Sequence, residues 1–287
     1  MRFGQRSLFA MALVLSTGAV GSLRAQFSMP EMFVPSAITN QLNEVMPVRV
    51  WRNYKASDCP VPVVVLLHGS GECGQDNARQ LAFFAPIHRQ ALVDKTLPPA
   101  LYLIPQCTQR NAWVRSLAFT EDYRQPRYSA PALRTVKGYL DQLVAEGVAD
   151  AGRLYIAGLS LGGFGTWDAI QRWPDYFAAA LPICGGGSVQ EAAVKNASTT
   201  AIWAFHGDKD VNVPVDCSRR LIAALEQAGA HPKYTEYENV GHNVWTRTFQ
   251  NKEVLRWLFQ QRRGKKQKSS TSSSGFWGRL KAYVTPD

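Results

Sequence analysis

Between residues 60 and 260, short apolar runs alternate with longer amphipathic stretches, and this alternation restricts the fold more than any other feature of the sequence. The runs are short and almost uniformly apolar, as expected of strands that are covered on both faces. They comprise residues 63–67, 101–104, 154–157, 178–183 and 200–205, followed by a more polar run at 233–237. Residues 27–58 are expected to add edge strands, for instance at 46–51.

The stretches between these runs carry apolar residues at the three-to-four spacing of a helix. The clearest is 129–146, and 215–227 and 246–260 are similar but less regular. Gly147 and Gly229 stand where two of these helices should end. Strands that alternate with helices predict an α/β fold with a mostly parallel central sheet and helices on both faces.

A glycine-flanked serine follows the predicted strand at 154–157. Residues 158–163 read Gly-Leu-Ser-Leu-Gly-Gly and open a helical stretch. A tight strand-to-helix turn of this kind lifts the Ser160 hydroxyl clear of the sheet, and the helix behind it presents free N–H groups to a developing negative charge. We therefore predict that Ser160 is a nucleophile.

A second glycine-rich segment, His68-Gly69-Ser70-Gly71-Glu72, comes directly after the strand at 63–67. Acyl transfer needs donors for an oxyanion, usually two backbone N–H groups. We predict that these are the N–H groups of Leu161 and Ser70, with Gly71 beside them in contact with the substrate. His68 precedes the serine and sits at a strand end, so we interpret it as structural rather than as the catalytic base.

An acid and a base should follow the serine, the acid first. Asp208 and Asp210 both lie just past the strand at 200–205 and compete for this role. We prefer Asp210, because its position before Val213-Pro214 is the one that the family resemblance described below implies. His242 follows the last strand and is the predicted general base, with Asp210 fixing its tautomer. Three other histidines are interpreted as turn or surface residues: His88, His206 and His231.

These segments together resemble the α/β-hydrolase superfamily, in particular the esterase and predicted-peptidase group related to the phospholipase/carboxylesterase family. The matching residues span 67–242: 67–72, Asp76-Asn77, 105–107 with Trp113, the Ser160 turn, 173–178, 182–186, the Asp210 segment and Gly241-His242. The resemblance implies carboxylic-ester hydrolysis by a Ser-His-Asp triad without a metal. The chain departs from the pattern at Cys73, where a basic residue is expected, and after residue 261.

Two further expectations concern the predicted carboxyl edge of the sheet. Cys73 and Cys107 follow strands that are neighbours in this fold, so a disulfide between them would make the oxyanion loop more rigid; two free thiols are the alternative. Trp113 follows the strand at 101–104 and would line the substrate pocket, with partial burial in the core as the alternative.

The two ends of the chain differ in composition from its body. Residues 1–25 begin with arginines, continue with a small and apolar stretch and end in Leu-Arg-Ala, which predicts a signal peptide cleaved near Ala25 and export to the periplasm or the medium. Residues 26–261 form the predicted catalytic domain. Residues 262–287 form a basic, Ser-rich tail that is predicted to be disordered and to make at most weak contact with a membrane surface.

The formal net charge of +10 is concentrated at these ends. Residues 1–25 contribute +3 and residues 261–287 contribute +6, which leaves about +1 for the body. The body therefore has no overall basic character, and we expect no nucleic-acid partner. No metal-ligand spacing, phosphate loop or dinucleotide fingerprint occurs, so we expect no metal and no cofactor.

Three functions remain in order of preference. The first is an exported esterase that acts on a small-molecule, carbohydrate or aryl ester. The second is a serine peptidase on the same scaffold. The third is a non-catalytic binding module, although such proteins usually lose the serine or the histidine.

Overall fold

The computed structural model describes residues 32–84, 87, 94, 96–110, 112–115 and 123–264. The predicted signal peptide and nearly all of the predicted tail lie outside these residues, as does His88. Within the described part of the chain, no helix has the length and apolar character needed to cross a membrane.

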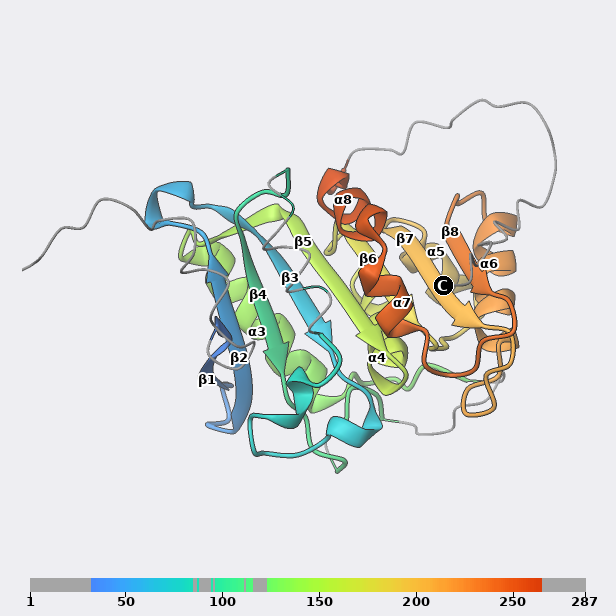
Figure 1. Cartoon of the computed structure of the whole chain (residues 1–287), viewed down its shortest axis with the longest axis horizontal. Helices are drawn as coiled ribbons and strands as arrows, with labels where there is room; N and C mark the ends of the chain where they lie inside the picture. Colours follow the sequence, from blue (N-terminus) through green and yellow to red (C-terminus); the bar gives the residue numbers. More distant parts are fainter. Residues whose placement is uncertain are drawn as a thin grey trace, which may run out of the picture.

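The described residues build one eight-stranded sheet in the order β1-β2-β4-β3-β5-β6-β7-β8 (Figure 1). Its strands are β1 (Val34–Thr39), β2 (Val45–Asn53), β3 (Val61–Leu67), β4 (Ala100–Pro105), β5 (Ala149–Leu159), β6 (Ala179–Ile183), β7 (Ala201–Gly207) and β8 (Lys233–Tyr237). β2 runs antiparallel to both of its neighbours, and the pairs from β4 to β8 are parallel. This is the strand order of the α/β-hydrolase fold that the resemblance implied.

β3 shows why a continuous apolar run forms a central strand. Its side chains alternate between the two faces of the sheet, and both faces are buried. Val63, Val65 and Leu67 pack into one hydrophobic core, whereas Val64 and Leu66 pack into the other. Each residue of β3 is therefore shielded from water, which at ~25 cal/mol per Å² of apolar surface favours the central position strongly.

Helices cover both of these cores. One face of the sheet packs against α3 (Pro131–Ala145), α4 (Leu161–Arg172), α5 (Glu191–Ala197) and α6 (Asp216–Gln227). The other face packs against α7 (Trp245–Gln250) and α8 (Lys252–Gln260), which lie in front of the sheet in Figure 1. Among the described residues, three single-turn 3-10 helices lie in loops: η2 (Ala56–Asp58), η3 (Ser70–Glu72) and η4 (Arg79–Leu81).

Helix ends follow the expected glycines at two places. Gly147 and Gly229 have φ values of +72° and +80°, which suits glycine because it has no Cβ. In each case the following N–H reaches back into the last turn, as Val148 does to Leu143 and Ala230 to Leu225.

The prediction of one helix at 246–260 is wrong in detail. The structure breaks this stretch at Asn251, which ends α7 with an extended backbone and caps α8 by accepting the N–H of Glu253 at its side chain. The short helix α5 was not predicted at all.

Candidate active site

Ser160 occupies the turn between β5 and α4, at the carboxyl end of the sheet. Its backbone has φ +53° and ψ −116°, a strained conformation for a residue with a side chain. The turn is held because the N–H of Ser160 donates to the carbonyl of Ile183 at 2.8 Å and its own carbonyl accepts from Phe164 at 3.0 Å. Ser160 is 9 % exposed, so its hydroxyl lies at the edge of the core.

Close backbone contacts explain the glycines on both sides of this turn. A Cβ at Gly158 would lie 2.2 Å from the carbonyl oxygen of Gly162. A Cβ at Gly162 would lie 2.1 Å from the carbonyl oxygen of Leu67, at the end of β3. The helix α4 can therefore start against the loop after β3 only if these positions lack side chains.

The three predicted triad residues come together at hydrogen-bond distance. Nε2 of His242 lies 2.9 Å from Oγ of Ser160, and Nδ1 of His242 lies 2.6 Å from Oδ2 of Asp210. The side chain of Asp210 is fully buried, whereas that of His242 is 16 % exposed. The two hydrogen bonds that connect the serine through the histidine to a buried carboxylate have the geometry of a serine-hydrolase triad.

His242 lies between β8 and α7 and is fixed from several sides. Its carbonyl accepts from the N–H of Val244 at 3.0 Å and from the thiol of Cys184 at 3.3 Å. Trp245 packs edge-on against the imidazole, with ring centroids 5.4 Å apart. These contacts limit the orientations that the ring can adopt.

Asp210 is held as an ionised carboxylate by its hydrogen bonds. Oδ1 accepts the backbone N–H groups of Asn212 and Val213, each at 2.9 Å. Burial opposes the charged form, but hydrogen bonds from His206, His242 and the backbone outweigh it and hold the pKa of Asp210 well below its usual range.

Asp208, the competing aspartate, has a different position. Its Oδ1 accepts the N–H of Val240 at 3.2 Å, and its own N–H donates to the carbonyl of Tyr237. Asp208 therefore connects the loop after β7 to the loop that carries His242, while Asp210 faces the imidazole itself.

The two predicted oxyanion donors begin helices that converge on this edge. Leu161 is the first residue of α4 and Ser70 is the first residue of η3. At the first helical position an N–H has no acceptor within its own helix, so both groups remain available to a ligand. Gly69, which precedes Ser70, lies against the serine: a Cβ there would be 3.6 Å from Cβ of Ser160.

The family of this chain follows from comparison with known sequences. The model of the phospholipase/carboxylesterase family matches residues 54–255. The chain belongs to this family. Similar proteins include esterases.

Three similar proteins illustrate the relationship. A thermostable esterase of known structure is 34 % identical, with a TM-score of 0.71 over 81 % of this chain and 64 % of that one. A probable carboxylesterase of Oryza sativa subsp. japonica is 25 % identical over 193 residues, which cover 63 % of this chain and 81 % of that protein. An uncharacterized secreted protein of Arthroderma benhamiae is 27 % identical over 219 residues, 67 % of this chain but only 22 % of that protein.

The loop after β3 (residues 68–72), which carries the predicted oxyanion donor Ser70, is anchored through His68. The N–H of Cys107 donates to Nε2 of His68 at 3.1 Å, so the ring proton is on Nδ1 and is donated to the carbonyl of Gly69 at 2.6 Å. Burial lowers the pKa of His68 to about 4, although the Gly69 contact raises it somewhat. The ring is fully buried and neutral, as a structural histidine should be.

Glu72 and Gln106 tie the same loop to its neighbours. Oε2 of Glu72 accepts the N–H of Gly69 at 2.9 Å. The amide of Gln106 donates to the carbonyl of Glu72 and to Asp76, and it accepts the N–H of Asn77. Glu72, Asp76 and Asn77 therefore all take part in the hydrogen bonds that hold this loop.

The substrate-binding role predicted for Trp113 is wrong in this structure. Its ring is fully buried and packs against Gly165, while its indole N–H donates to the carbonyl of His68 at 3.0 Å. A ring without exposed surface cannot line a pocket, and through this hydrogen bond Trp113 supports the loop that carries Ser70. Gly71 is exposed, and a Cβ there would meet no atom within 4 Å, so contact with a ligand remains a prediction.

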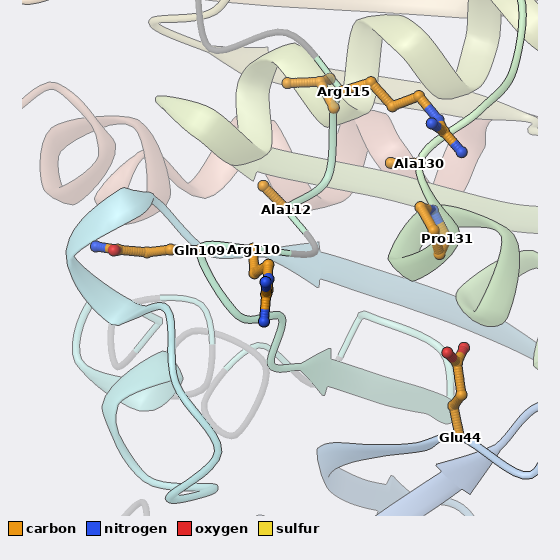
Figure 2. Close-up of a pocket in the computed structure, with 8 residues that line it drawn as sticks. Glu44, Gln109, Arg110, Ala112, Arg115, Ala130 and Pro131 are labelled. Atoms are coloured by element: carbon orange, nitrogen blue, oxygen red, sulfur yellow. The ribbon is translucent and has the colours of Figure 1, made fainter.

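The segment around Trp113 does line a cavity, but with other residues. Ala112, Val114, Arg110 and Arg115 face a space of about 520 Å³ together with Glu44 and the start of α3 (Figure 2). The residues that line this cavity include neither the triad nor the predicted oxyanion donors.

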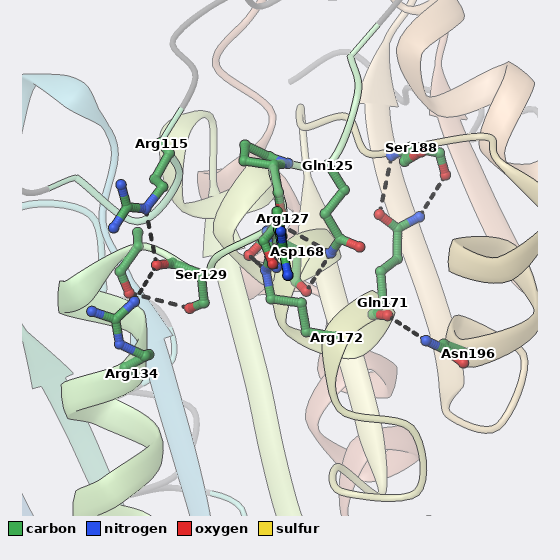
Figure 3. A network of polar contacts seen from close by, with 12 residues as sticks. Arg115, Gln125, Arg127, Ser129, Arg134, Asp168, Gln171, Arg172, Ser188 and Asn196 are labelled. Carbon is green, nitrogen blue, oxygen red and sulfur yellow. Dashed lines mark hydrogen bonds and ion pairs between the residues drawn. The ribbon is translucent and has the colours of Figure 1, made fainter.

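The helix α4 is anchored by a network of polar contacts at its far end (Figure 3). Buried Asp168 pairs with Arg172 at 2.6 Å and accepts from Gln125 at 3.1 Å. Gln171 exchanges two hydrogen bonds with Ser188, at 2.7 and 3.0 Å. These contacts hold the segments that flank α4, and thereby the helix that begins behind Ser160.

Two sets of potential metal ligands occur among the described residues. Their ligand atoms lie within 4.8 Å of one another: His68, Cys73 and Cys107, and Cys184, His206 and Asp210. The sequence spacing gave no sign of either set because each set includes a residue that is distant in the sequence: Cys107 in the first and Cys184 in the second. Hydrogen bonds already engage both ring nitrogens of each histidine, and we assign neither set a metal.

Proposed function

We propose that this chain hydrolyses carboxylic esters through an acyl-enzyme, with Ser160, His242 and Asp210 as its catalytic triad. The observation that carries the proposal is the continuous hydrogen-bonded chain from Oγ of Ser160 through His242 to Asp210. Membership of the carboxylesterase family and the 34 % identical esterase support the same reaction.

In the first half-reaction, Oγ of Ser160 attacks the ester carbonyl while Nε2 of His242 takes its proton. The imidazolium that forms is stabilised by the carboxylate of Asp210, which remains ionised because of its hydrogen bonds. His242 then protonates the departing alcohol, which leaves an ester on Ser160. Water repeats the sequence and releases the acid.

The negative charge on the carbonyl oxygen is assigned to the backbone N–H groups of Leu161 and Ser70. A single such donor typically contributes about 10²–10³-fold to the rate. His68, Glu72 and Trp113 anchor the loop that carries Ser70, and this anchoring preorganises the oxyanion hole, because the donors must be in place before the charge develops.

The substrate that we propose is a small-molecule, carbohydrate or aryl ester outside the cytoplasm. This location rests on the charged and apolar order of residues 1–25, and the secreted relative is consistent with it. We propose no nucleic-acid partner, and only weak membrane-surface contact through residues 262–287.

Steady-state hydrolysis of p-nitrophenyl acetate and butyrate tests the proposal. The full chain should hydrolyse both esters, and Ser160→Ala should lose this activity. Ser198→Ala, a serine-to-alanine change at the end of α5, is the matched control and should retain it. Survival of activity in Ser160→Ala would refute the proposal, and cleavage of peptide anilides but not esters would favour a peptidase.

The assignment of the acid is tested by a matched pair of variants. Asp210→Asn should reduce kcat by about 10³–10⁴-fold, because the amide favours the wrong tautomer of His242. Asp208→Asn keeps an oxygen that can accept from Val240 and should lose less than about tenfold. Equal losses in the two variants would contradict the assignment.

A further inference from the structure

The carboxylate of Asp210 is shared by two imidazoles. Oδ2 receives Nδ1 of His242 at 2.6 Å and lies 3.2 Å from Nε2 of His206. The second histidine was interpreted from the sequence only as a turn residue. It is the penultimate residue of β7 and is fully buried.

The surroundings of His206 fix the position of its proton. Nε2 faces the carbonyl oxygen of Val213 at 3.0 Å as well as the carboxylate of Asp210, and both are acceptors. Nε2 must therefore carry a hydrogen. Nδ1 lies 2.7 Å from the hydroxyl of Ser218, which can donate to it.

Through the same contacts His206 holds both ends of the loop that carries Asp210. Asp210 already accepts the N–H of Asn212 and of Val213 on Oδ1, which curls the loop around the carboxylate. The bond from His206 to the carbonyl of Val213 connects the end of this loop to the strand it left. The ring thus reaches both the loop backbone and the catalytic oxygen.

We propose that His206 is a positioning residue of the triad, whose Nε2–H fixes Asp210 and shares the oxygen that holds His242. This inference rests on the proposed function. By donating to Oδ2, His206 orients the carboxylate toward the imidazole and also withdraws part of its charge. His242 is then held firmly enough to keep its tautomer, yet releases its proton readily at each half-reaction.

The direction of the effect follows from the groups that face Asp210. The titratable groups in contact are His206 from β7, His242 from the loop before α7, and the thiol of Cys184 after β6. Removing the donor at His206 leaves the carboxylate charge to His242 alone, so the Asp210–His242 pair binds its proton more tightly. The acid limb of the kcat/KM profile should then move to higher pH.

Two polar variants separate this role from simple support of the loop. In His206→Gln the amide nitrogen can reach the position of Nε2 and still donate to Asp210. In His206→Asn the shorter amide reaches only the position of Nδ1, beside Ser218. With p-nitrophenyl butyrate, we expect His206→Asn to lose about tenfold or more in kcat/KM and to shift the acid limb upward by about one pH unit. We expect His206→Gln to keep the wild-type acid limb.

A wild-type acid limb in both variants, with equal losses of rate, would overturn the proposal and leave His206 a structural residue. A second measurement does not depend on activity or on the folding of His206→Asn. Nitrogen NMR of the histidine-labelled full chain should show His206 protonated at Nε2 and not at Nδ1, with His206→Gln identifying its signals. The opposite tautomer would overturn the proposal even if the chain is an active esterase. An inactive chain with the expected tautomer would instead count against the esterase function.

Discussion

Replacement of Gly162 by alanine tests whether the close contact between α4, the helix that follows Ser160, and the loop that carries Ser70 positions the two proposed oxyanion donors. The new Cβ would lie 2.1 Å from the carbonyl oxygen of Leu67 and 2.7 Å from that of His68. Both atoms belong to backbone, at the end of β3 and the start of the loop that carries Ser70. No flexible side chain can move aside to relieve the overlap.

The size of the effect follows from these distances. Contacts of a real Cβ are essentially never shorter than 3.0 Å, so helix and loop must separate by at least 0.9 Å. This displacement acts between Leu161 and Ser70, the two proposed donors. A misplacement of about 1 Å costs about 10²-fold in rate, and overpacking costs about 1–3 kcal/mol of stability, partly offset by the gain in helix propensity.

Gly138→Ala is the matched control. Gly138 is exposed in the middle of α3, and a Cβ there meets no atom within 4 Å. This variant should be about 0.5–1 kcal/mol more stable than the wild type because alanine loses less entropy in a helix, and its activity should not change.

Urea unfolding followed by tryptophan fluorescence, together with kcat/KM for p-nitrophenyl butyrate, measures both quantities. We expect Gly162→Ala to unfold at lower urea and to lose about 10²-fold in rate. A Gly162→Ala variant as stable and as active as Gly138→Ala would show that the close contact between α4 and β3 does not position the oxyanion donors.

Two more predictions concern the anchored loop. The pKa of His68 is about 4 in the folded state against an ordinary 6.5, so the unfolded chain binds the extra proton first as the pH falls. The wild type should therefore lose about 3 kcal/mol of its free energy of unfolding as the pH falls from 6.5 to about 4. In His68→Asn this loss should be absent, and urea titrations that show an equal pH dependence in both proteins would contradict it. The Sγ atoms of Cys73 and Cys107 lie 3.9 Å apart as free thiols, and their hydrogen bond lowers the pKa of Cys73. In the oxidising compartment proposed for this protein, an oxidant should convert the two thiols to a disulfide by removing two protons and two electrons. Mass spectrometry of unreduced protein should find this pair protected from alkylation, and modification of both thiols would rule the bridge out.

The parallel sheet and the meeting of Ser160, Asp210 and His242 at one edge could be predicted because both depend on local patterns, whereas the strand order was implied by the family resemblance. A run such as 63–67 is apolar on both faces, which is the signature of a central parallel strand. Ser160, Asp210 and His242 each follow a strand end, and parallel strands bring their carboxyl ends to one edge of the sheet. Chain position therefore carried most of the information about the site.

Other features depend on side-chain orientations and loop courses that sequence patterns do not reveal. Trp113 follows a strand, but side-chain alternation no longer holds in a loop, and its ring turned inward to the carbonyl of His68. His206 lies at a position that suits a turn residue, and only the curl of the loop brings Asp210 back onto it. The break at Asn251 was hidden because apolar spacing continues on both of its sides, while the cap is a single side chain.

Ser160 should form a covalent intermediate with the help of His242, and an organophosphate that traps an activated serine can detect it. The full chain would be titrated with diethyl p-nitrophenyl phosphate and then examined by intact mass and peptide mapping. We expect one diethylphosphoryl group per chain, located on Ser160, with esterase activity lost in proportion to its formation. A label on another residue, or ester hydrolysis that persists once Ser160 is fully modified, would contradict it.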